Sequence, residues 1–211
     1  MSDTMMINEH FRSIQGEGIM MGIPTYFIRT MGCNLSCDWC DTLYANESGM
    51  EMSVGDIIAL TENTENVCVT GGEPLLQPDI RELLNGLIAA GKRTVVETNG
   101  SVDVSSVPED KNIIVSMDIK CPSSKMTDRM FMSNIEKLAE KDQLKFVIKD
   151  DNDFEFAVEV ISSRKISANI IFCPVGGMEL RPIIEEVLAR GLNVRILPQL
   201  HKLVWGDRRS V

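Results

Sequence analysis

The sequence lacks the features that would place the chain in several broad protein classes. Basic residues are in the minority, because 21 lysines and arginines stand against 31 aspartates and glutamates, a formal net charge of −10. A nucleic-acid-binding surface needs a basic stripe, so we expect no nucleic-acid partner. No stretch approaches the roughly 20 consecutive apolar residues of a membrane span, so we expect no membrane partner either.

Cysteine is also scarce, and the first residues carry no export signal. Six cysteines in 211 residues are too few for a disulfide scaffold. Met1 to His10 lack both the basic segment and the apolar segment of a signal peptide. We therefore expect a cytoplasmic protein, in a reducing compartment where cysteine thiolates persist.

Three of the cysteines are clustered, and their number is informative. Cys33, Cys37 and Cys40 have a C-x3-C-x2-C spacing with no fourth cysteine nearby. A cubane iron–sulfur cluster contains four irons, so three thiolates would leave one iron open to a substrate or cofactor. The alternatives are a zinc site or buried cysteines that bind nothing. A structural zinc site needs four ligands, and the remaining three cysteines are isolated from one another.

Short β-rich runs alternate with helical periodicity along the chain, which is typical of βαβ units and a parallel sheet. An N-terminal strand is expected at Ile7 to Phe11. About seven parallel strands are expected at 26–30, 66–70, 94–97, 113–117, 144–149, 169–172 and 194–197. Helices are expected at 56–61, 78–90, 134–139, 154–162 and 180–190.

These elements predict an α/β fold, a partial TIM-like barrel of parallel strands with outer helices. A full eightfold barrel typically takes ~250 residues, and this chain is shorter. An open doubly wound sheet is the alternative. No internal repeat, low-complexity segment or linker interrupts the sequence, so we expect residues 1–211 to form a single domain.

Polar and glycine-bearing segments follow the expected parallel strands. Chemistry in parallel α/β folds collects in the loops after the carboxyl ends of the strands, which share one edge. We therefore expect these segments to form one site. They are 31–40, 71–74, 98–101, 118–122, 174–177 and 198–202.

The second of these segments, Gly71-Gly72-Glu73-Pro74, suits a ligand with an ammonium group. Two glycines let the backbone approach a ligand closely and adopt positive φ. Their carbonyl groups and the Glu73 carboxylate can accept hydrogen bonds from an ammonium. A plain turn ahead of the helix at 78–90 is the alternative interpretation.

Other segments resemble one known family. The run FRSIQGEG at 11–18, followed by Arg29, the three cysteines and Thr42, resembles the 7-carboxy-7-deazaguanine synthases. These enzymes belong to the radical S-adenosylmethionine (SAM) superfamily, whose GGEP segment is similar to residues 71–74. The segments QLHK (199–202) and WG (205–206) resemble the end of the same family, so the resemblance spans essentially the whole chain. It departs at 116–120, where Ser-Met-Asp-Ile-Lys stands in place of a Ser-Pro-Lys run.

The resemblance implies an enzyme of 7-deazapurine biosynthesis, on the route to queuosine or archaeosine. Such an enzyme contracts 6-carboxy-5,6,7,8-tetrahydropterin to 7-carboxy-7-deazaguanine with loss of ammonia. The implied cofactors are a [4Fe-4S] cluster, SAM and Mg²⁺, and the implied partners are an external one-electron reductant and a second copy of the chain in a homodimer. The reduced cluster would cleave SAM to methionine and a 5′-deoxyadenosyl radical, which takes a hydrogen from C6 of the pterin.

The resemblance also implies which residues form the site, without assigning a catalytic acid or base. The cluster ligands are Cys33, Cys37 and Cys40, and Thr42 binds Mg²⁺. The expected pterin contacts are Ile14, Gln15, Gly16, Arg29, Thr98 and His201. The expected SAM contacts are Gly71, Gly72, Glu73, Gly100, Ser116 and Lys120. Arg29 offers a bidentate fork for the pterin carboxylate, and an ordinary ion pair is its alternative role.

Two rival functions stay open at this point. An activase that installs a glycyl radical on a partner protein would share the cluster and the GGEP-like loop, but it would need a docking surface and has no use for a pterin pocket. An iron–sulfur electron carrier would favour complete four-cysteine ligation. Neither a carrier nor a zinc-bound interaction module would need FRSIQGEG or GGEP.

Overall fold

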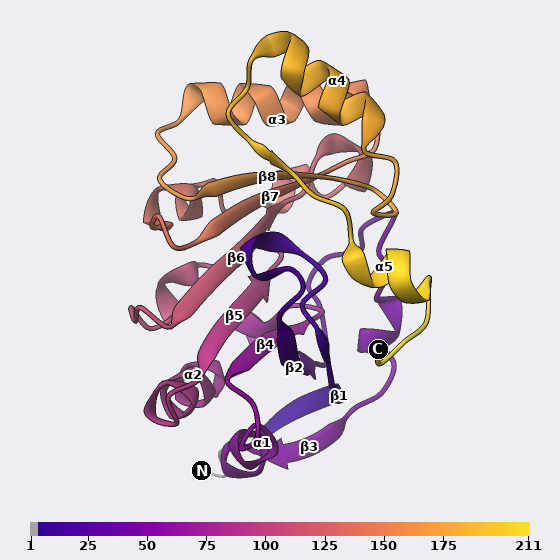
Figure 1. The fold of residues 1–211 in the computed structure, drawn as a ribbon. Coiled ribbons are helices and arrows are strands. Elements are labelled where there is room, and N and C mark those ends of the chain that lie inside the picture. Colours follow the sequence, from indigo (N-terminus) through magenta and orange to yellow (C-terminus); the bar gives the residue numbers. More distant parts are fainter. Residues whose placement is uncertain (1–3) are drawn as a thin grey trace.

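The computed structural model describes residues 4–211, and these form one nine-stranded sheet with helices on its outer side (Figure 1). The strand order is β3-β1-β2-β4-β5-β6-β7-β8-β9, so β3 and β9 form two edges and the sheet does not close. The strands are β1 (Thr4–Ile14), β2 (Pro24–Thr30), β3 (Met50–Ser53), β4 (Asn66–Gly71), β5 (Arg93–Thr98), β6 (Ile113–Ile119), β7 (Gln143–Ile148), β8 (Asn169–Pro174) and β9 (Arg195–Ile196).

The sheet confirms the predicted partial TIM-like barrel. Seven strands, β2 and β4 to β9, pair in parallel in the order in which they occur along the chain. The expected N-terminal strand is present as β1, which pairs antiparallel with β2 and with β3. The strand β3 was not expected, because its apolar–polar alternation, Met-Glu-Met-Ser, covers only four residues and is too short to be recognised.

Four helices agree with the sequence prediction and one does not. The helices are α1 (Val54–Leu60), α2 (Ile80–Ala89), α3 (Asp151–Ser163), α4 (Arg181–Arg190) and α5 (Leu200–Trp205). Ser53 caps α1 as expected, because its hydroxyl accepts a hydrogen bond from Asp56 N at 3.0 Å. The segment 198–202 was expected to be a loop, whereas α5 begins within it at Leu200.

The helix expected at 134–139 is instead a 3₁₀ helix, η7 (Met132–Lys137). Its geometry is set by a buried asparagine. The Asn134 side chain donates to Val102 O at 2.7 Å and accepts from Val104 N at 3.1 Å. These bonds hold the turn against the loop after β5, and such short tethered segments commonly take the tighter helix.

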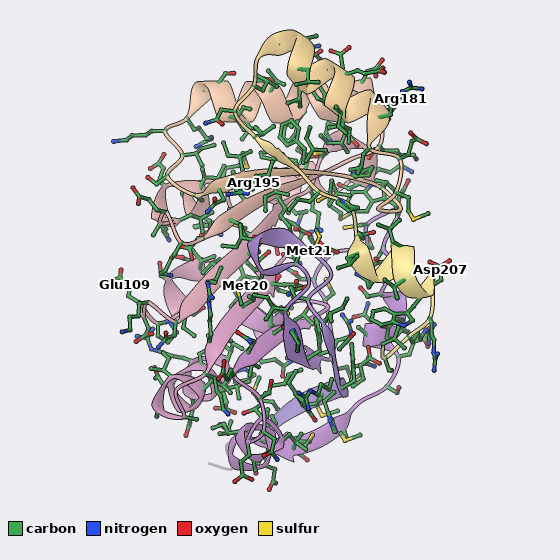
Figure 2. All side chains as sticks on the ribbon, viewed as in Figure 1. Met20, Met21, Glu109, Arg181, Arg195 and Asp207 are labelled. Carbon is green, nitrogen blue, oxygen red and sulfur yellow. The ribbon has the colours of Figure 1, made fainter. Side chains whose placement is uncertain are left out.

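Alternate residues of the parallel strands pack on opposite sides of the sheet, as the strand period requires. On the outer side, residues such as Val69 and Phe146 pack under the helices in the main core. On the inner side, Cys68 and Ile114 form a smaller apolar cluster with Met20. Figure 2 labels Met20 on the loop between β1 and β2, so this loop fills the concave side of the barrel.

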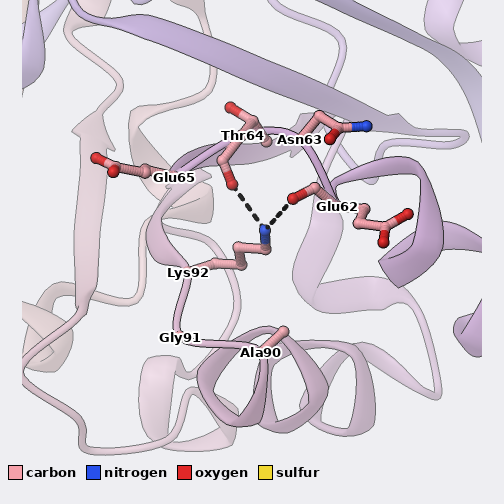
Figure 3. Close-up of a pocket in the computed structure, with 7 residues that line it drawn as sticks. All are labelled: Glu62, Asn63, Thr64, Glu65, Ala90, Gly91 and Lys92. Carbon is pink, nitrogen blue, oxygen red and sulfur yellow. Dashed lines mark hydrogen bonds between the residues drawn. The ribbon is translucent and has the colours of Figure 1, made fainter.

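A surface cavity of about 270 Å³ lies near the amino ends of β4 and β5 (Figure 3). Lys92 Nζ donates there to the carbonyl oxygens of Thr61 at 2.7 Å, Glu62 at 3.1 Å and Thr64 at 2.7 Å. The ammonium thereby binds carbonyl groups at the C-terminal end of α1 and in the turn that follows it. This cavity is at the opposite end of the strands from the segments expected to form the site.

A bilayer-spanning helix would have to be long and continuously apolar, and none of the helices in residues 4–211 meets that description.

Candidate active site

The predicted site segments follow the carboxyl ends of neighbouring parallel strands. The cysteine loop follows Thr30 at the end of β2, the GGEP segment begins at Gly71 at the end of β4, and the next segment begins at Thr98 at the end of β5. These strands are adjacent in the sheet in the order β2-β4-β5. The three loops therefore emerge side by side, as the sequence predicted.

Cys33, Cys37 and Cys40 are half-buried free thiols on one loop. Cys33 Sγ lies 3.4 Å from Leu35 N and 3.5 Å from Asn99 Nδ2, both of which can donate to it. Backbone and amide donors of this kind stabilise a thiolate, which is the form that binds a metal. The loop thus presents its first sulfur to donors from its own backbone and from the loop after β5.

The other end of the cysteine loop is held by the segment that follows β6. Trp39 Nε1 donates to Ser123 Oγ at 3.0 Å, and Asp38 N donates to Ser124 O at 3.3 Å. Burial raises the pKa of the Cys37 thiol, and the Lys120 ammonium acts in the opposite direction. A metal would deprotonate such a thiol outright.

Within residues 4–211, no three side chains of the types His, Cys, Asp and Glu are gathered tightly enough to hold one metal ion. A cubane does not require such a gathering, because its protein thiolates bind different irons. Three half-buried, unpaired thiols on one loop at the carboxyl edge of the sheet are a donor set that fits a three-thiolate cluster.

The GGEP segment is in direct contact with the start of the cysteine loop. A Cβ at Gly72 would lie 2.3 Å from Gly32 O and 2.7 Å from Cys33 Cβ, so no larger residue fits there without movement. Glu73 N donates to Gly32 O at 2.8 Å. The two loops are therefore packed backbone to backbone.

Glu73 turns its side chain into the protein and joins the loops after β4 and β5. Its fully buried carboxylate accepts hydrogen bonds from Leu75 N at 2.9 Å, Thr98 Oγ1 at 2.9 Å and Asn99 N at 2.6 Å. Burial raises the pKa of Glu73 to about 7. The Glu73 carboxylate and the Thr98 hydroxyl, both expected to contact ligands, thus also bond to each other.

Two predicted SAM contacts lie further along, Gly100 in the loop after β5 and Ser116 within β6. Gly100 has φ of +76°, and a Cβ there would lie 2.5 Å from Asp118 O, so the two strand ends approach closely. Ser116 is buried, and its hydroxyl has no hydrogen-bond partner among the described residues. A buried hydroxyl is seldom left without a partner in a protein interior, and a bound ligand could supply one.

A chain of alternating charges crosses the inner side of the barrel. Lys145 Nζ lies 2.7 Å from Glu17 Oε2 and 3.2 Å from Asp118 Oδ1, and Lys120 Nζ lies 2.8 Å from Asp118 Oδ2. The most exposed of these four side chains is 20% exposed. Burial alone would raise the pKa of Asp118, but the two lysines hold it at about 2, so the group remains ionised. We call these four residues the interior ion chain.

Lys145 was not among the predicted site residues, although the sequence pattern indicates that its side chain lies on the inner side of the sheet. In the run Gln143-Leu144-Lys145-Phe146-Val147, polar residues alternate with apolar ones over part of a strand. Because Leu144 and Phe146 pack in the main core, the period of two places Lys145 on the inner side. What the sequence could not reveal was its partner, since Glu17 lies 128 positions earlier.

The FRSIQGEG turn enters the concave side of the barrel and is held by β5 and β7. Gln15 Nε2 donates to Glu97 Oε1 at 3.3 Å, and Ile19 N donates to Gln143 Oε1 at 2.8 Å. Gln15 and Gly16 are buried, whereas Ile14 is half-buried at the end of β1. The turn that composition alone suggested is therefore a fixed part of the inner wall.

The terminal segment, residues 199–206, packs on the FRSIQGEG turn, although the two lie at opposite ends of the sequence. Leu200 N donates to Gly16 O at 2.8 Å, and Gln199 Nε2 donates to Glu17 Oε1 at 2.7 Å. His201 lies so close that a Cβ at Gly16 would be 2.2 Å from its Nδ1. Figure 1 shows α5 on the open side of the barrel, where the sheet has no strand. The structure thus brings His201 to the predicted pterin segment.

Arg29 and Thr42 lie on either side of the cysteine loop in the sequence. Arg29 Nε donates to Glu9 Oε1 at 2.8 Å, and this is the single hydrogen bond of its guanidinium within residues 4–211. Its two terminal nitrogens remain for a carboxylate. Thr42 Oγ1 lies 3.7 Å from Cys40 Sγ and does not cap the short 3₁₀ helix that follows it. Its oxygen remains for another partner.

Comparison with known proteins identifies similar chains over nearly the whole length. The family model of the radical SAM superfamily matches residues 27–161. A 7-carboxy-7-deazaguanine synthase from Thermoplasma acidophilum is 38% identical, over 96% of this chain and 98% of its own. The synthase from Methanospirillum hungatei is 44% identical, over 96% of this chain and 86% of its own. The crystal structure of QueE from Escherichia coli matches with a TM-score of 0.79 and 25% identity, over 94% of this chain and 95% of that one.

Proposed function

The chain belongs to the 7-carboxy-7-deazaguanine synthase family of the radical SAM superfamily, and we propose that it carries out that family's ring contraction. The substrate is 6-carboxy-5,6,7,8-tetrahydropterin, the product is 7-carboxy-7-deazaguanine, and ammonia is released. One observation carries the proposal. The FRSIQGEG turn, the terminal segment and the interior ion chain meet on the inner side of the barrel, below the loop of three free thiols.

The superfamily uses a [4Fe-4S] cluster and SAM, and this chain has residues suited to hold both. In our proposal Cys33, Cys37 and Cys40 would hold the cluster, and the three-thiolate set would leave a position open for SAM. Together these groups supply the chemistry of the superfamily, reductive cleavage of SAM to a 5′-deoxyadenosyl radical that takes a hydrogen from the pterin. An external one-electron donor must deliver the electron, and the half-buried thiols place the cluster within reach of a partner at the surface.

The loops after β4, β5 and β6 would orient SAM. The backbone groups of Gly71 and Gly72 would accept from its ammonium, and Gly100 and Ser116 would line the same space. Glu73 would act chiefly by holding the loops, because its carboxylate already accepts three internal hydrogen bonds. Lys120, fixed by Asp118 at 2.8 Å, would offer a positive charge for the SAM carboxylate.

The pterin would lie between the FRSIQGEG turn and β2. Arg29 would pair with its carboxylate through the two terminal nitrogens that have no partner within residues 4–211. Ile14, Gln15 and Gly16 would meet the pterin edge, with His201 packed behind Gly16 and the Thr98 hydroxyl on the opposite wall. These donors and acceptors would exclude water from the ring while the radical reacts.

Several further assignments remain predictions. Thr42 would contribute its hydroxyl, which lies 3.7 Å from Cys40 Sγ, to Mg²⁺. Substrate oxygens and waters would complete the shell, because one threonine is a poor magnesium site alone. We also propose a homodimer and a cytoplasmic location. We propose a single domain spanning residues 1–211 as well, and the presence of one continuous sheet supports that proposal.

An anaerobic reconstitution tests the function directly. Protein loaded with iron and sulfide should contain about four irons per chain and should convert the pterin with SAM and dithionite to a product with the mass of 7-carboxy-7-deazaguanine. Formation of 5′-deoxyadenosine without this product would favour the glycyl-radical activase. Iron bound by four protein thiolates would favour an electron carrier.

A matched pair of cysteine variants tests the ligand assignment. Cys37→Ala should lose the cluster, measured as iron content and as visible absorption. Cys68→Ala should keep it, because Cys68 is fully buried in the inner apolar cluster. The opposite pattern would show that the cluster ligands have been misassigned.

A further inference from the structure

Glu9 lies opposite Arg29 because the β1–β2 ladder contains a bulge. Ile7 pairs with Thr30, and the next pair along the ladder is Glu9 with Arg29. β1 therefore holds one extra residue, Asn8, between two successive pairs. In an unbroken antiparallel ladder Asn8 would oppose Arg29, and Glu9 would point to the other face. A bulge that redirects one side chain is a common device beside active sites.

The bulged residue is itself anchored, which fixes the bulge in place. Asn8 Nδ2 donates to Ser48 O at 2.6 Å and to Tyr44 O at 3.2 Å. Both carbonyls belong to the segment that follows the cysteine loop. The position of Glu9 is therefore set by contacts on its own strand and by the segment beyond Cys40.

Glu9 then collects donors from three distant parts of the chain. Its Oε1 accepts from Arg29 Nε at 2.8 Å and from Tyr44 OH at 3.0 Å, and its Oε2 accepts from Ser210 Oγ at 2.6 Å. Arg209 stacks on the Tyr44 ring, with its Cζ 4.0 Å from the ring centroid. Burial tends to raise the pKa of Glu9, but the bonds from Ser210 and Arg29 lower it overall, so the carboxylate stays ionised at neutral pH.

These contacts decide which edge of the Arg29 guanidinium can meet a substrate. The Nε edge is occupied by Glu9, so the edge with the two terminal nitrogens is presented to a ligand. An unrestrained arginine side chain loses rotamer freedom when it is ordered. Ordering it before binding removes part of that cost. Glu9 also repels a second carboxylate, so positioning and repulsion have opposite effects on binding.

We propose that Glu9 is a positioning residue for Arg29. Glu9 orients the Arg29 guanidinium toward the substrate carboxylate and so increases the binding affinity that this carboxylate contributes. The inference rests on the proposed function, in which Arg29 pairs with the carboxylate of the pterin. Glu9 itself touches no substrate. Tyr44 supports it from the segment that follows the cysteine loop, and Arg209 and Ser210 support it from the last residues of the chain.

The experiment compares two ligands that differ only in the carboxylate. Anaerobic binding of 6-carboxytetrahydropterin and of tetrahydropterin without the carboxylate is measured on the reconstituted wild type and its variants. Glu9→Met removes every acceptor at this position and should weaken binding of the carboxylated pterin about tenfold, with little change for the other ligand. Glu9→Gln keeps an acceptor oxygen for Arg29 and should lose only about twofold to threefold.

Two controls isolate the effect. Glu155→Met removes a carboxylate that is also paired with an arginine, Arg190, on the outer helices, and it should leave both affinities unchanged. In an Arg29→Met background, the further change Glu9→Met should have no effect, because the group that Glu9 orients is gone. Iron content and the far-ultraviolet circular dichroism spectrum should be normal in Glu9→Met, which shows that the protein is folded and loaded.

The remaining outcomes overturn the inference in distinguishable ways. If Glu9→Met binds the carboxylated pterin as tightly as the wild type or more tightly, Glu9 acts only as a repelling charge. Equal losses for the two ligands would show general damage to the pocket rather than positioning of Arg29. A wild-type protein that binds neither pterin would remove the proposed function, and the role of Glu9 with it.

Discussion

Replacing Asp118 by asparagine should destabilise the protein strongly, because Asp118 is the centre of the interior ion chain. Its two carboxylate oxygens lie 2.8 Å from Lys120 Nζ and 3.2 Å from Lys145 Nζ. The change Asp118→Asn keeps the shape and one acceptor oxygen but removes the charge. Lys145 would then keep its ion pair with Glu17, whereas Lys120 would lose the one carboxylate with which it is paired among the described residues.

The magnitude follows from the burial and from the pKa of Asp118. Removing one partner of a buried ion pair costs about 3–5 kcal/mol, because it leaves an uncompensated charge. The pKa of about 2, against an ordinary value of 3.8, corresponds to about 2 kcal/mol of stabilisation at neutral pH. This stabilisation is present above pH 3.8 and is lost as the pH falls through about 2. Since asparagine keeps an acceptor, we expect a loss of about 3 kcal/mol at pH 7.

Urea unfolding at pH 7, followed by circular dichroism, measures this loss. A decrease of about 3 kcal/mol should lower the melting temperature by roughly 6–12 °C in a chain of this length. The control Glu155→Gln removes a carboxylate from the exposed pair with Arg190 and should leave the unfolding curve unchanged. The double variant Asp118→Asn with Lys120→Met should recover part of the loss, because the pair between Lys145 and Glu17 remains intact.

The predicted loss of stability is wrong if Asp118→Asn unfolds at the same urea concentration as Glu155→Gln. That result would mean that water or a rearranged lysine compensates the missing charge. The proposed coupling is also wrong if the double variant has a lower free energy of unfolding than Asp118→Asn, by as much as an independent Lys120→Met substitution would cost. The two lysines would then not share one carboxylate.

Two further predictions concern the loops that hold the cofactor side of the site. Burial raises the pKa of Glu73 from 4.5 to about 7, so its contribution to stability is fully present below pH 4.5 and is lost as the pH rises through about 7. The free energy of unfolding should therefore fall between about pH 4.5 and pH 7 in the wild type and stay flatter in Glu73→Gln over that range, and equal slopes would refute this origin. Gly72→Ala should weaken SAM binding at least tenfold while Gly55→Ala does not, because a Cβ at Gly72 would lie 2.3 Å from Gly32 O and one at Gly55 would meet only ordinary contacts. Unchanged SAM affinity in Gly72→Ala, measured by titration, would show that the two loops can separate without harm.

The order of the parallel strands could be predicted from the sequence because it depends on local patterns. Apolar runs bounded by glycine, proline and caps mark each strand and helix, and right-handed βαβ connections then place successive strands side by side. The same rule put the cysteine loop and the GGEP segment on one edge. The α-helical assignment of 134–139 was wrong because the Asn134 side chain, bonded to Val102 and Val104, overrides local propensity.

The partners of the polar side chains could not be predicted, because they lie far apart in the chain. Glu17 meets Lys145 across 128 positions, and Ser210 meets Glu9 across 201. Glu73 looked like a ligand group in the sequence, yet the approach of the loops after β4 and β5 turns its carboxylate inward to Thr98 and Asn99. Such pairings depend on how the sheet curves and where the termini return.

By itself, then, the sequence determined that three thiols share one loop, and it determined the edge of the sheet on which that loop lies. The sequence also identified the FRSIQGEG turn, because the residue types and spacing of that run are specific. Only the tertiary structure decided which charges are paired, through the bulge opposite Arg29 and the interior ion chain. The physical reason is that hydrogen bonds and ion pairs act over a few ångströms, whereas sequence patterns describe only neighbours along the chain.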